Sequence, residues 1–191
     1  MGLQTPLIIT GMTVLFFVIW IMVTYNMLIR IKELCSESWA DIDTELRRRY
    51  DLIPNLVSAV KGYADHERKV LRSVIEARDK AKAAAATLET KTPVEKALTE
   101  KVRQLLALSE KYPDLKASEN FLELQSALVD TEDRIQAARR FYNANVREIN
   151  TQIEVFPSKI IAQIFHITGK EFFEIEDARP DAPPAVDMET S

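Results

Sequence analysis

Four side chains near the middle of the sequence could in principle bind a metal ion or exchange protons with a substrate: Asp41, Asp43, His66 and Glu67. Carboxylates and imidazoles are common metal ligands and common general acids and bases. However, His66-Glu67 is not followed by a second histidine at the zinc-hydrolase spacing, and adjacent helix residues do not face the same way. The pattern therefore supports a metal-dependent enzyme only as a remote alternative.

Other catalytic motifs are missing from the sequence. It contains no Gly-rich phosphate loop, no Gly-x-Ser-x-Gly turn for a nucleophilic serine and no Cys-x-x-Cys pair. The single cysteine, Cys35, excludes a disulfide within the chain, and its place on an apolar helix stripe indicates a buried side chain and not a reactive thiol. We therefore expect no enzymatic activity, no bound metal and no cofactor.

The N-terminal segment predicts a membrane anchor. Residues 1–29 contain no charged side chain, and the apolar run over about 7–28 is long enough to cross a bilayer as a helix. A cleaved signal peptide would need a basic segment before this run and a small-residue cleavage site after it, and neither is present. Arg30, Lys32 and Arg47-Arg48-Arg49 follow the anchor, so the positive-inside rule predicts an N-terminus outside the cell and a cytoplasmic C-terminal domain.

The composition of the remaining chain predicts an all-α domain. Glycines are few, and strand-like alternation with Asn-Gly or Asp-Gly turns is absent. The net charge of −4 is concentrated after Lys170, which leaves the central domain near neutral and without a basic stripe for nucleic acid. We expect an N-terminal transmembrane helix that continues into a three- to four-helix antiparallel cytoplasmic bundle.

Pro54 marks the expected break between the first two soluble helices. Proline has no backbone N–H and disfavours helical geometry in the residue before it, so the first helix should end or kink between Tyr50 and Ile53. A second helix is then expected from Pro54 to Leu88, with Gly62 allowing a close helix crossing. A full reversal at Pro54 would bring the far end of this helix to the bilayer, so we favour a kink or an outward continuation. Glu67 and Arg78 fall on the apolar seam of this helix, where a charge needs a partner.

Two further helices are expected. Thr92-Pro93 suits the start of a third helix, Tyr112-Pro113-Asp114 interrupts it, and Ser118 opens a fourth that ends before Phe156-Pro157. The fourth helix has a strict three-four alternation of apolar residues at Phe121, Leu124, Leu128, Ile135, Ala138, Tyr142 and Ile149, with polar seam positions at Thr131, Asn145 and Gln152. We expect these polar positions to determine the register of the helices.

The sequence thus divides into four parts. Residues 1–29 form the anchor and residues 30–155 the helical bundle. Residues 156–175 form an apolar C-terminal segment that is too short to span a membrane. We expect this segment to pack on the bundle as a flap in preference to lying in the membrane interface, because Lys159 adds little basic charge. Residues 176–191 are acidic and proline-rich, which is typical of a disordered tail.

The motifs of the central segment resemble those of the LemA family of bacterial membrane proteins. The most specific of them is the run Arg48-Arg49-Tyr50-Asp51-Leu52-Ile53-Pro54-Asn55-Leu56-Val57, and the likeness covers nearly the whole chain. The resemblance implies a single inner-membrane anchor, an antiparallel helical bundle, no established reaction, and relatives associated with magnetosomes and with membrane-protease neighbourhoods. The motif positions that form a candidate interaction surface or structural element are Trp39, Asp41, Asp43, Arg48, Arg49, Asp51, Pro54, Asn55, Lys61, Gly62, Tyr63, His66, Glu67, Arg139, Phe141, Tyr142 and Asn143.

These patterns together favour a scaffold over an enzyme. Amphipathic helices with long apolar seams need partners for faces that the bundle leaves uncovered. We expect a single-pass membrane protein that forms homo-oligomers, organises membrane or partner proteins, or does both, in contact with the lipid bilayer. An adaptor or regulatory subunit of a membrane protease or transporter is the alternative, with a membrane protein as partner.

Overall fold

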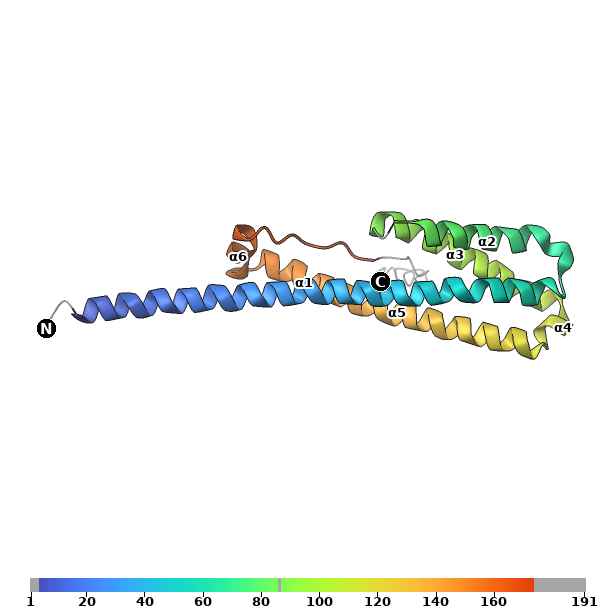
Figure 1. Cartoon of the computed structure of the whole chain (residues 1–191), viewed down its shortest axis with the longest axis horizontal. Helices are drawn as coiled ribbons and strands as arrows, with labels where there is room; N and C mark the ends of the chain where they lie inside the picture. The colour runs from blue at the N-terminus through green and yellow to red at the C-terminus, as the bar shows by residue number, and fades with distance from the viewer. Residues whose placement is uncertain (1–3, 86, 174–191) are drawn as a thin grey trace, which may run out of the picture. The chain divides into compact units, whose positions relative to one another are not determined.

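The computed structural model describes residues 4–85 and 87–173, and this part of the chain is helical without strands (Figure 1). The six α-helices of this part are α1 (Gln4–Lys61), α2 (Arg68–Ala83), α3 (Leu88–Leu108), α4 (Pro113–Lys116), α5 (Glu119–Glu154) and α6 (Ser158–Ile164). Two 3₁₀ turns, η1 (Asp65–Glu67) and η2 (Ser109–Lys111), lie between them. The predicted all-α fold class is confirmed, and the tail predicted over 176–191 lies outside the described residues.

The first part of α1 has the properties of a membrane span. From Leu7 to Val23 its large apolar side chains are exposed, except for the half-buried Trp20, and this segment of α1 is a continuous helix (Figure 1). Within the described part of the chain, α1 is the one helix long and apolar enough to cross a membrane. Burial begins at Thr24 and then recurs at Leu28, Ile31 and Cys35, a spacing of three and four residues. The helix thus changes from uniformly apolar to one-sided within two turns.

The sequence predicted that the helix ends or kinks near Tyr50 to Ile53. The predicted end is wrong, because α1 continues through Pro54 to Lys61. In a regular helix the N–H of residue 54 would bond to the carbonyl of Tyr50, and proline cannot supply that donor. The Arg78 side chain replaces it, since Nε of Arg78 donates to the Tyr50 carbonyl at 3.1 Å. A charged donor from α2 therefore compensates for the proline. Arg78 has two partners, the Tyr50 carbonyl and the carboxylate of Asp79, whose Oδ1 lies 2.8 Å from Nη1 of Arg78.

The chain turns at Gly62 to Glu67, so the prediction of one helix from Pro54 to Leu88 is also wrong. The amides of Tyr63 and Ala64 both bond to the carbonyl of Val60, at 3.1 and 2.9 Å, and end α1. Gly62 lies just after the helix, where an added Cβ would meet only the Ala59 carbonyl oxygen, at an ordinary 3.6 Å. The expected close helix crossing at Gly62 is absent.

The described residues divide into two compact units, and the first contains residues 4–49 and 129–172. In this unit α1 and α5 run antiparallel, because residues later in α1 meet residues earlier in α5. The pairs are Leu34 with Asn145, Trp39 with Tyr142, and Arg49 with Glu132. The antiparallel arrangement of these helices was predicted from the sequence and is confirmed.

The contact face of α5 departs from the strict three-four alternation predicted for it. Arg139 and Val146 are buried, where Ala138 and Asn145 were expected, so the buried positions include two consecutive steps of four. The same irregularity occurs in α1 at Ser38, Ile42 and Leu46, and in α5 it covers Thr131, Ile135 and Arg139. Such a step pattern favours local unwinding of a helix pair.

In the described part of the chain, the second unit contains residues 50–85, 87–128 and Phe173. Its α2 and α3 form an antiparallel hairpin, in which Lys91 near the start of α3 reaches Ala81 near the end of α2. The apolar core of the unit lies between the end of α1, the hairpin, α4 and the start of α5. It contains Ile53, Leu56, Val60, Leu71, Val74, Leu98, Val102, Leu105, Leu115, Phe121 and Leu128.

The third helix begins earlier than predicted, at Leu88 and not at Thr92-Pro93. Thr90 supports the earlier start, because its hydroxyl donates to the Ala85 carbonyl at 2.9 Å and contacts the Thr87 hydroxyl at 2.7 Å. Pro93 removes only the bond to the carbonyl of Glu89, which is an exposed residue in the first turn. The break at Tyr112-Pro113 and the end of the long helix before Phe156-Pro157 are where the sequence predicted them.

The apolar C-terminal segment forms α6 in the first unit. One face of α6 packs onto the unit, with Ser158, Ile161 and Ala162 buried. The Ser158 hydroxyl donates to the Gln152 carbonyl at 2.6 Å and so ties α6 to the end of α5. The expected packing of this segment is confirmed for that face, whereas Ile160 and Ile164 on the other face are exposed.

Candidate functional site

The first polar site is a buried arginine held between α1 and α5. Arg49 is 1% exposed, and its Nη1 lies 2.7 Å from Oε1 of Glu132, whose side chain is 31% exposed. Removing a guanidinium from water is strongly unfavourable unless an opposite charge and hydrogen bonds replace the lost hydration. The three arginines at 47–49 differ accordingly: Arg47 pairs with Asp43 at the surface, Arg48 is exposed, and Arg49 is the one in the helix contact face.

Aromatic and amide side chains of the same unit continue the contact between α1 and α5. The rings of Trp39 and Tyr142 lie 5.6 Å apart, and the Tyr142 hydroxyl donates to the Glu171 carbonyl at 3.0 Å. Burial, with smaller contributions from Cys35 and Glu171, raises the pKa of Tyr142. Asn145 donates to the Leu34 carbonyl at 3.3 Å and to the Ser38 hydroxyl at 3.2 Å. The predicted polar seam position Asn145 thus forms hydrogen bonds across the two helices.

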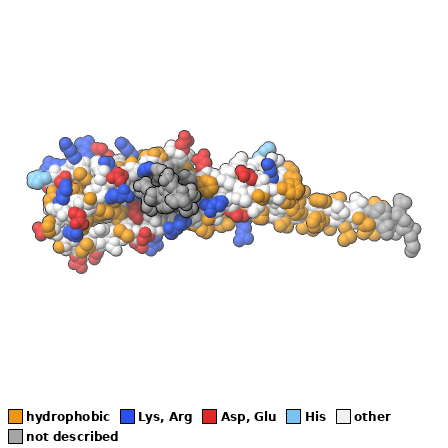
Figure 2. Space-filling model, turned by 180° about the vertical axis from the view of Figure 1, so that it is seen from behind, with side chains coloured by type: hydrophobic (Ala, Val, Ile, Leu, Met, Phe, Trp, Pro, Cys, Tyr) orange, Lys and Arg blue, Asp and Glu red, His pale blue; other side chains and the backbone are white. Residues whose placement is uncertain are grey.

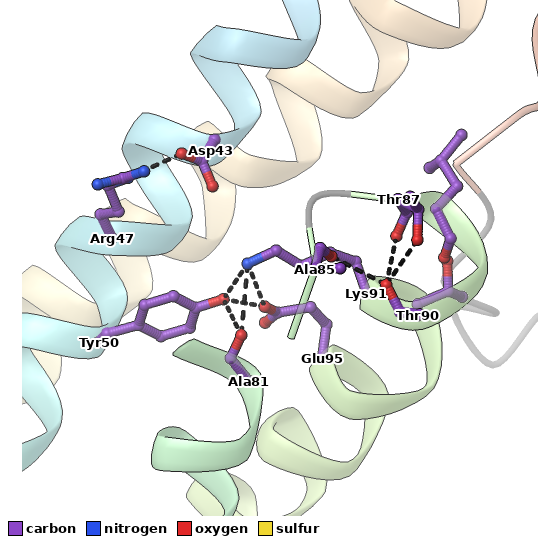
Figure 3. Close-up of polar contacts among 11 residues, drawn as sticks. Asp43, Arg47, Tyr50, Ala81, Ala85, Thr87, Thr90, Lys91 and Glu95 are labelled. Carbon is purple, nitrogen blue, oxygen red and sulfur yellow. Dashed lines mark hydrogen bonds and ion pairs between the residues drawn. The ribbon is translucent and has the colours of Figure 1, made fainter. Parts of the chain in front are cut away.

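The second polar site is a closed cluster of Tyr50, Lys91 and Glu95 in the second unit (Figure 3). All three side chains are buried, and the Tyr50 hydroxyl donates to the Glu95 carboxylate. The Lys91 ammonium donates to the Tyr50 hydroxyl at 3.2 Å, lies 5.3 Å from the centre of its ring, and is 4.0 Å from Oε1 of Glu95. The cation therefore has a carboxylate, a hydroxyl and an aromatic face as partners.

Lys91 also completes the end of α2. The last four carbonyls of a helix have no donor within it, and the negative end of the helix dipole favours a cation there. Ala81 lies in this last turn, and the Lys91 ammonium donates to its carbonyl at 3.3 Å. Because Lys91 belongs to α3, this bond also holds the two arms of the α2 and α3 hairpin together.

The remaining motif residues are mostly at the surface and are not brought into one site. Asp41, Asp51, Asn55, Lys61, Tyr63 and His66 are exposed. Asp43 bonds to Arg47 at 2.7 Å. Beside His66, the Arg68 guanidinium holds the pKa of exposed Asp65 below its usual value. In the described ranges no group of three His, Cys, Asp or Glu residues could hold a metal ion, so Asp41, Asp43, His66 and Glu67 do not assemble into the metal site considered from the sequence.

The motif around Arg139 separates into a buried and an exposed part. Arg139 and Tyr142 are buried and Asn143 is half-buried, whereas the ring of Phe141 between them is 54% exposed. This alternation follows from the helix, because residues 139 and 142 are three apart and share a face that residue 141 does not. Phe141 is therefore the motif's large apolar side chain that remains available at the surface of α5.

Three members of the polar sites were not predicted from the sequence: Lys91, Glu95 and Glu132. Lys91 and Glu95 continue backward the three-four spacing of Leu98, Val102 and Leu105, and this was the signal that could have found them. Placing the start of the helix at Thr92-Pro93 hid that spacing. No comparable signal marks Glu132, because half-exposed acids are common along a helix surface.

Comparison with known proteins identifies the family. The model of the LemA family matches residues 38–188. Protein LemA of Metamycoplasma hominis is 26% identical over 187 residues, which cover 93% of this chain and 82% of that protein. Magnetosome protein MamQ of Magnetospirillum gryphiswaldense is 20% identical over 200 residues, covering 92% and 74%, and Magnetosome protein MamQ 2 of Paramagnetospirillum magneticum is 21% identical over 201 residues, covering 90% and 72%.

Proposed function

The chain belongs to the LemA family, and we propose that it is a membrane-anchored scaffold that binds copies of itself or other membrane proteins and catalyses no reaction. The chain is a helical membrane protein, and its described residues contain one helix, near the N-terminus, that is long and apolar enough to span a membrane. The names of its relatives denote no enzymatic activity, and two of them are magnetosome proteins. A scaffold at a membrane is consistent with the apolar span and with the names of these relatives.

The observation that carries this proposal is the use of the buried charged side chains. Arg49 bonds to Glu132 between α1 and α5, and Lys91 bonds to Tyr50 and to the end of α2. Tyr50, Lys91 and Glu95 are shielded from solvent, so a substrate could reach none of them without opening the core. Their geometry serves helix packing, which leaves the exposed side chains as the means of interaction with other molecules.

For topology, we propose an inner-membrane anchor with the N-terminus outside and the C-terminal domain in the cytoplasm. The support is the distribution of basic residues, since Arg30, Lys32 and Arg47 to Arg49 all follow the span. Protease added to sealed inverted vesicles should remove a C-terminal tag. Protection of the tag in those vesicles would place the domain on the opposite side.

Phe141 offers the sharpest test of the scaffold. A photoreactive phenylalanine analogue at position 141 should cross-link the chain to a second copy or to a membrane protein in intact cells. The matched control is the same analogue at Val129, which lies on α5 in the same unit and is 52% exposed but is not part of the motif. We expect cross-linked species from position 141 and a markedly lower yield from position 129.

The identity of the cross-linked species decides between the scaffold and the adaptor. Predominant cross-linking to other copies, together with an oligomeric mass in mild detergent, supports the scaffold. Cross-linking to one protease or transporter in a fixed stoichiometry supports the adaptor instead of the scaffold. A strictly monomeric full-length protein with equal, weak cross-linking at both positions would refute both.

A further inference from the structure

The helix α6 has apolar side chains on both of its faces. One face contributes Ile161 and Ala162 to the first unit, where they are buried. Ile160 and Ile164, four residues apart on the other face, are exposed, and Ile164 is 61% exposed. Val155 and Phe156 before the helix and Phe165 after it are exposed as well. We refer to these five residues, Val155, Phe156, Ile160, Ile164 and Phe165, as the α6 patch.

The α6 patch lies beside the end of the membrane span. The rings of Phe165 and Tyr25 are 4.5 Å apart, and both belong to the first unit. Tyr25 follows Val23, the last residue of the exposed apolar run of α1, by two residues, or about 3 Å of helix rise. Figure 2 shows hydrophobic side chains gathered where the exposed part of α1 emerges from the rest of the molecule.

This position determines which partner the α6 patch fits. A helix that has crossed the hydrocarbon core passes next through the headgroup region, where tyrosine is enriched. Short apolar segments that lie parallel to the bilayer insert their side chains into the same region. Lys159 is exposed next to Ile160, where its ammonium can contact lipid phosphates. Glu154 nearby is also exposed and offsets this positive charge, so the attraction to the membrane comes from apolar contact.

We propose that the α6 patch inserts into the headgroup region of the bilayer and forms a second membrane contact beside the transmembrane span. The buried face of α6 remains packed on the unit, and Ser158 keeps it tied to the end of α5. Two membrane contacts, one from α1 and one from α6, restrict the tilt and rotation of the first unit at the bilayer surface. This contact is independent of whether the protein acts as a scaffold.

The test uses the full-length chain with Cys35→Ala, labelled with the fluorophore NBD at Ile164→Cys. The matched control carries NBD at Val129→Cys, an exposed position of the same unit on α5. Each protein is reconstituted into phosphatidylcholine nanodiscs at one copy per disc, with a nitroxide on the lipid chain near the headgroup. A second label, at Phe156→Cys, gives an independent reading at the most exposed residue of the patch.

We expect the NBD emission at positions 164 and 156 to be blue-shifted relative to position 129. The lipid nitroxide should quench these two positions roughly two- to threefold more than position 129, because their side chains are inserted into the membrane interface. Aqueous iodide should quench position 129 more strongly. Equal lipid quenching at all three positions would overturn the proposal. The proposal would also be overturned if position 164 were shielded from iodide only in discs that hold several copies of the protein, and were not quenched by the lipid nitroxide. That result would indicate contact between chains.

Discussion

Arg49 and Tyr50 are neighbours in α1, yet they belong to two polar sites of different construction. Arg49 has a carboxylate partner with a solvent-exposed edge, Glu132, and their ion pair lies between two antiparallel helices. Tyr50 belongs to a cluster whose members are all buried and bonded to one another, and whose cation also binds a helix end. The first site can be partly hydrated when it is altered, and the second cannot.

The difference indicates how the two units tolerate buried charge. A buried ion that loses its partner is left with an unfavourable desolvation, and water can reduce this penalty only where it has access. The half-exposed Glu132 provides such access near Arg49, whereas Lys91 and Glu95 have none. We therefore expect the closed cluster to be the more sensitive of the two sites.

The largest effect is expected for Glu95→Ala, which leaves the Lys91 ammonium buried without its carboxylate. Breaking a buried ion pair from one side costs about 3–5 kcal/mol of unfolding free energy. Urea unfolding of the full-length protein in detergent micelles, followed by helical circular dichroism, measures this loss. The double variant Lys91→Met/Glu95→Leu should recover most of it, because both buried charges are then gone.

A smaller loss is expected for Glu132→Gln, which keeps the shape of the side chain and removes the charged acceptor of Arg49. A hydrogen bond to a charged group contributes about 1.5–3 kcal/mol. The same unfolding experiment applies, and Asp43→Asn is the control, because it removes a surface pair with Arg47 that contributes at most about 0.5 kcal/mol. If Glu132→Gln destabilised the protein as much as Glu95→Ala, the contrast between the sites would be refuted.

Loss of the hydrogen bond from Arg78 to the Tyr50 carbonyl should lower the free energy of unfolding by less than the two preceding changes. Arg78→Ala should cost about 1–2 kcal/mol, because the carbonyl released by Pro54 loses its donor. In a Pro54→Ala background the new backbone N–H can supply that donor, so the cost of Arg78→Ala should fall. Equal costs of Arg78→Ala in the two backgrounds would show that the guanidinium does not act through the proline.

The smallest effect concerns Cys35, a buried thiol on the α1 face of the first unit. Burial raises the pKa of Cys35 above its ordinary value of 9.0, partly opposed by Lys170. The folded state then favours the protonated thiol, so its contribution to stability is complete below pH 9 and falls as the pH rises through the higher folded value. Alkylation by iodoacetamide at pH 8 should be much slower in the native protein than in urea. Equal rates would contradict this burial.

Much of the fold could be predicted because the decisive signals are local. The apolar run of α1, the alternation of three and four residues in α5 and the break at Tyr112-Pro113 all act within a few turns of chain. The candidate site could be predicted only in part. Trp39, Arg49, Arg139 and Tyr142 were recognised as motif residues and lie in the helix contact faces, but the partners of Arg49 and Tyr50 come from distant segments.

Hydrophobicity and the helical period are properties of neighbouring residues, so the apolar span, the helical class and most of the buried faces can be derived from the order of the amino acids alone. The passage of α1 through Pro54, with the turn only after Lys61, depends instead on contacts between distant segments. The physical reason is the donor that proline lacks: it is supplied by Arg78, on a helix that follows the turn, and becomes available only when that helix has packed against α1.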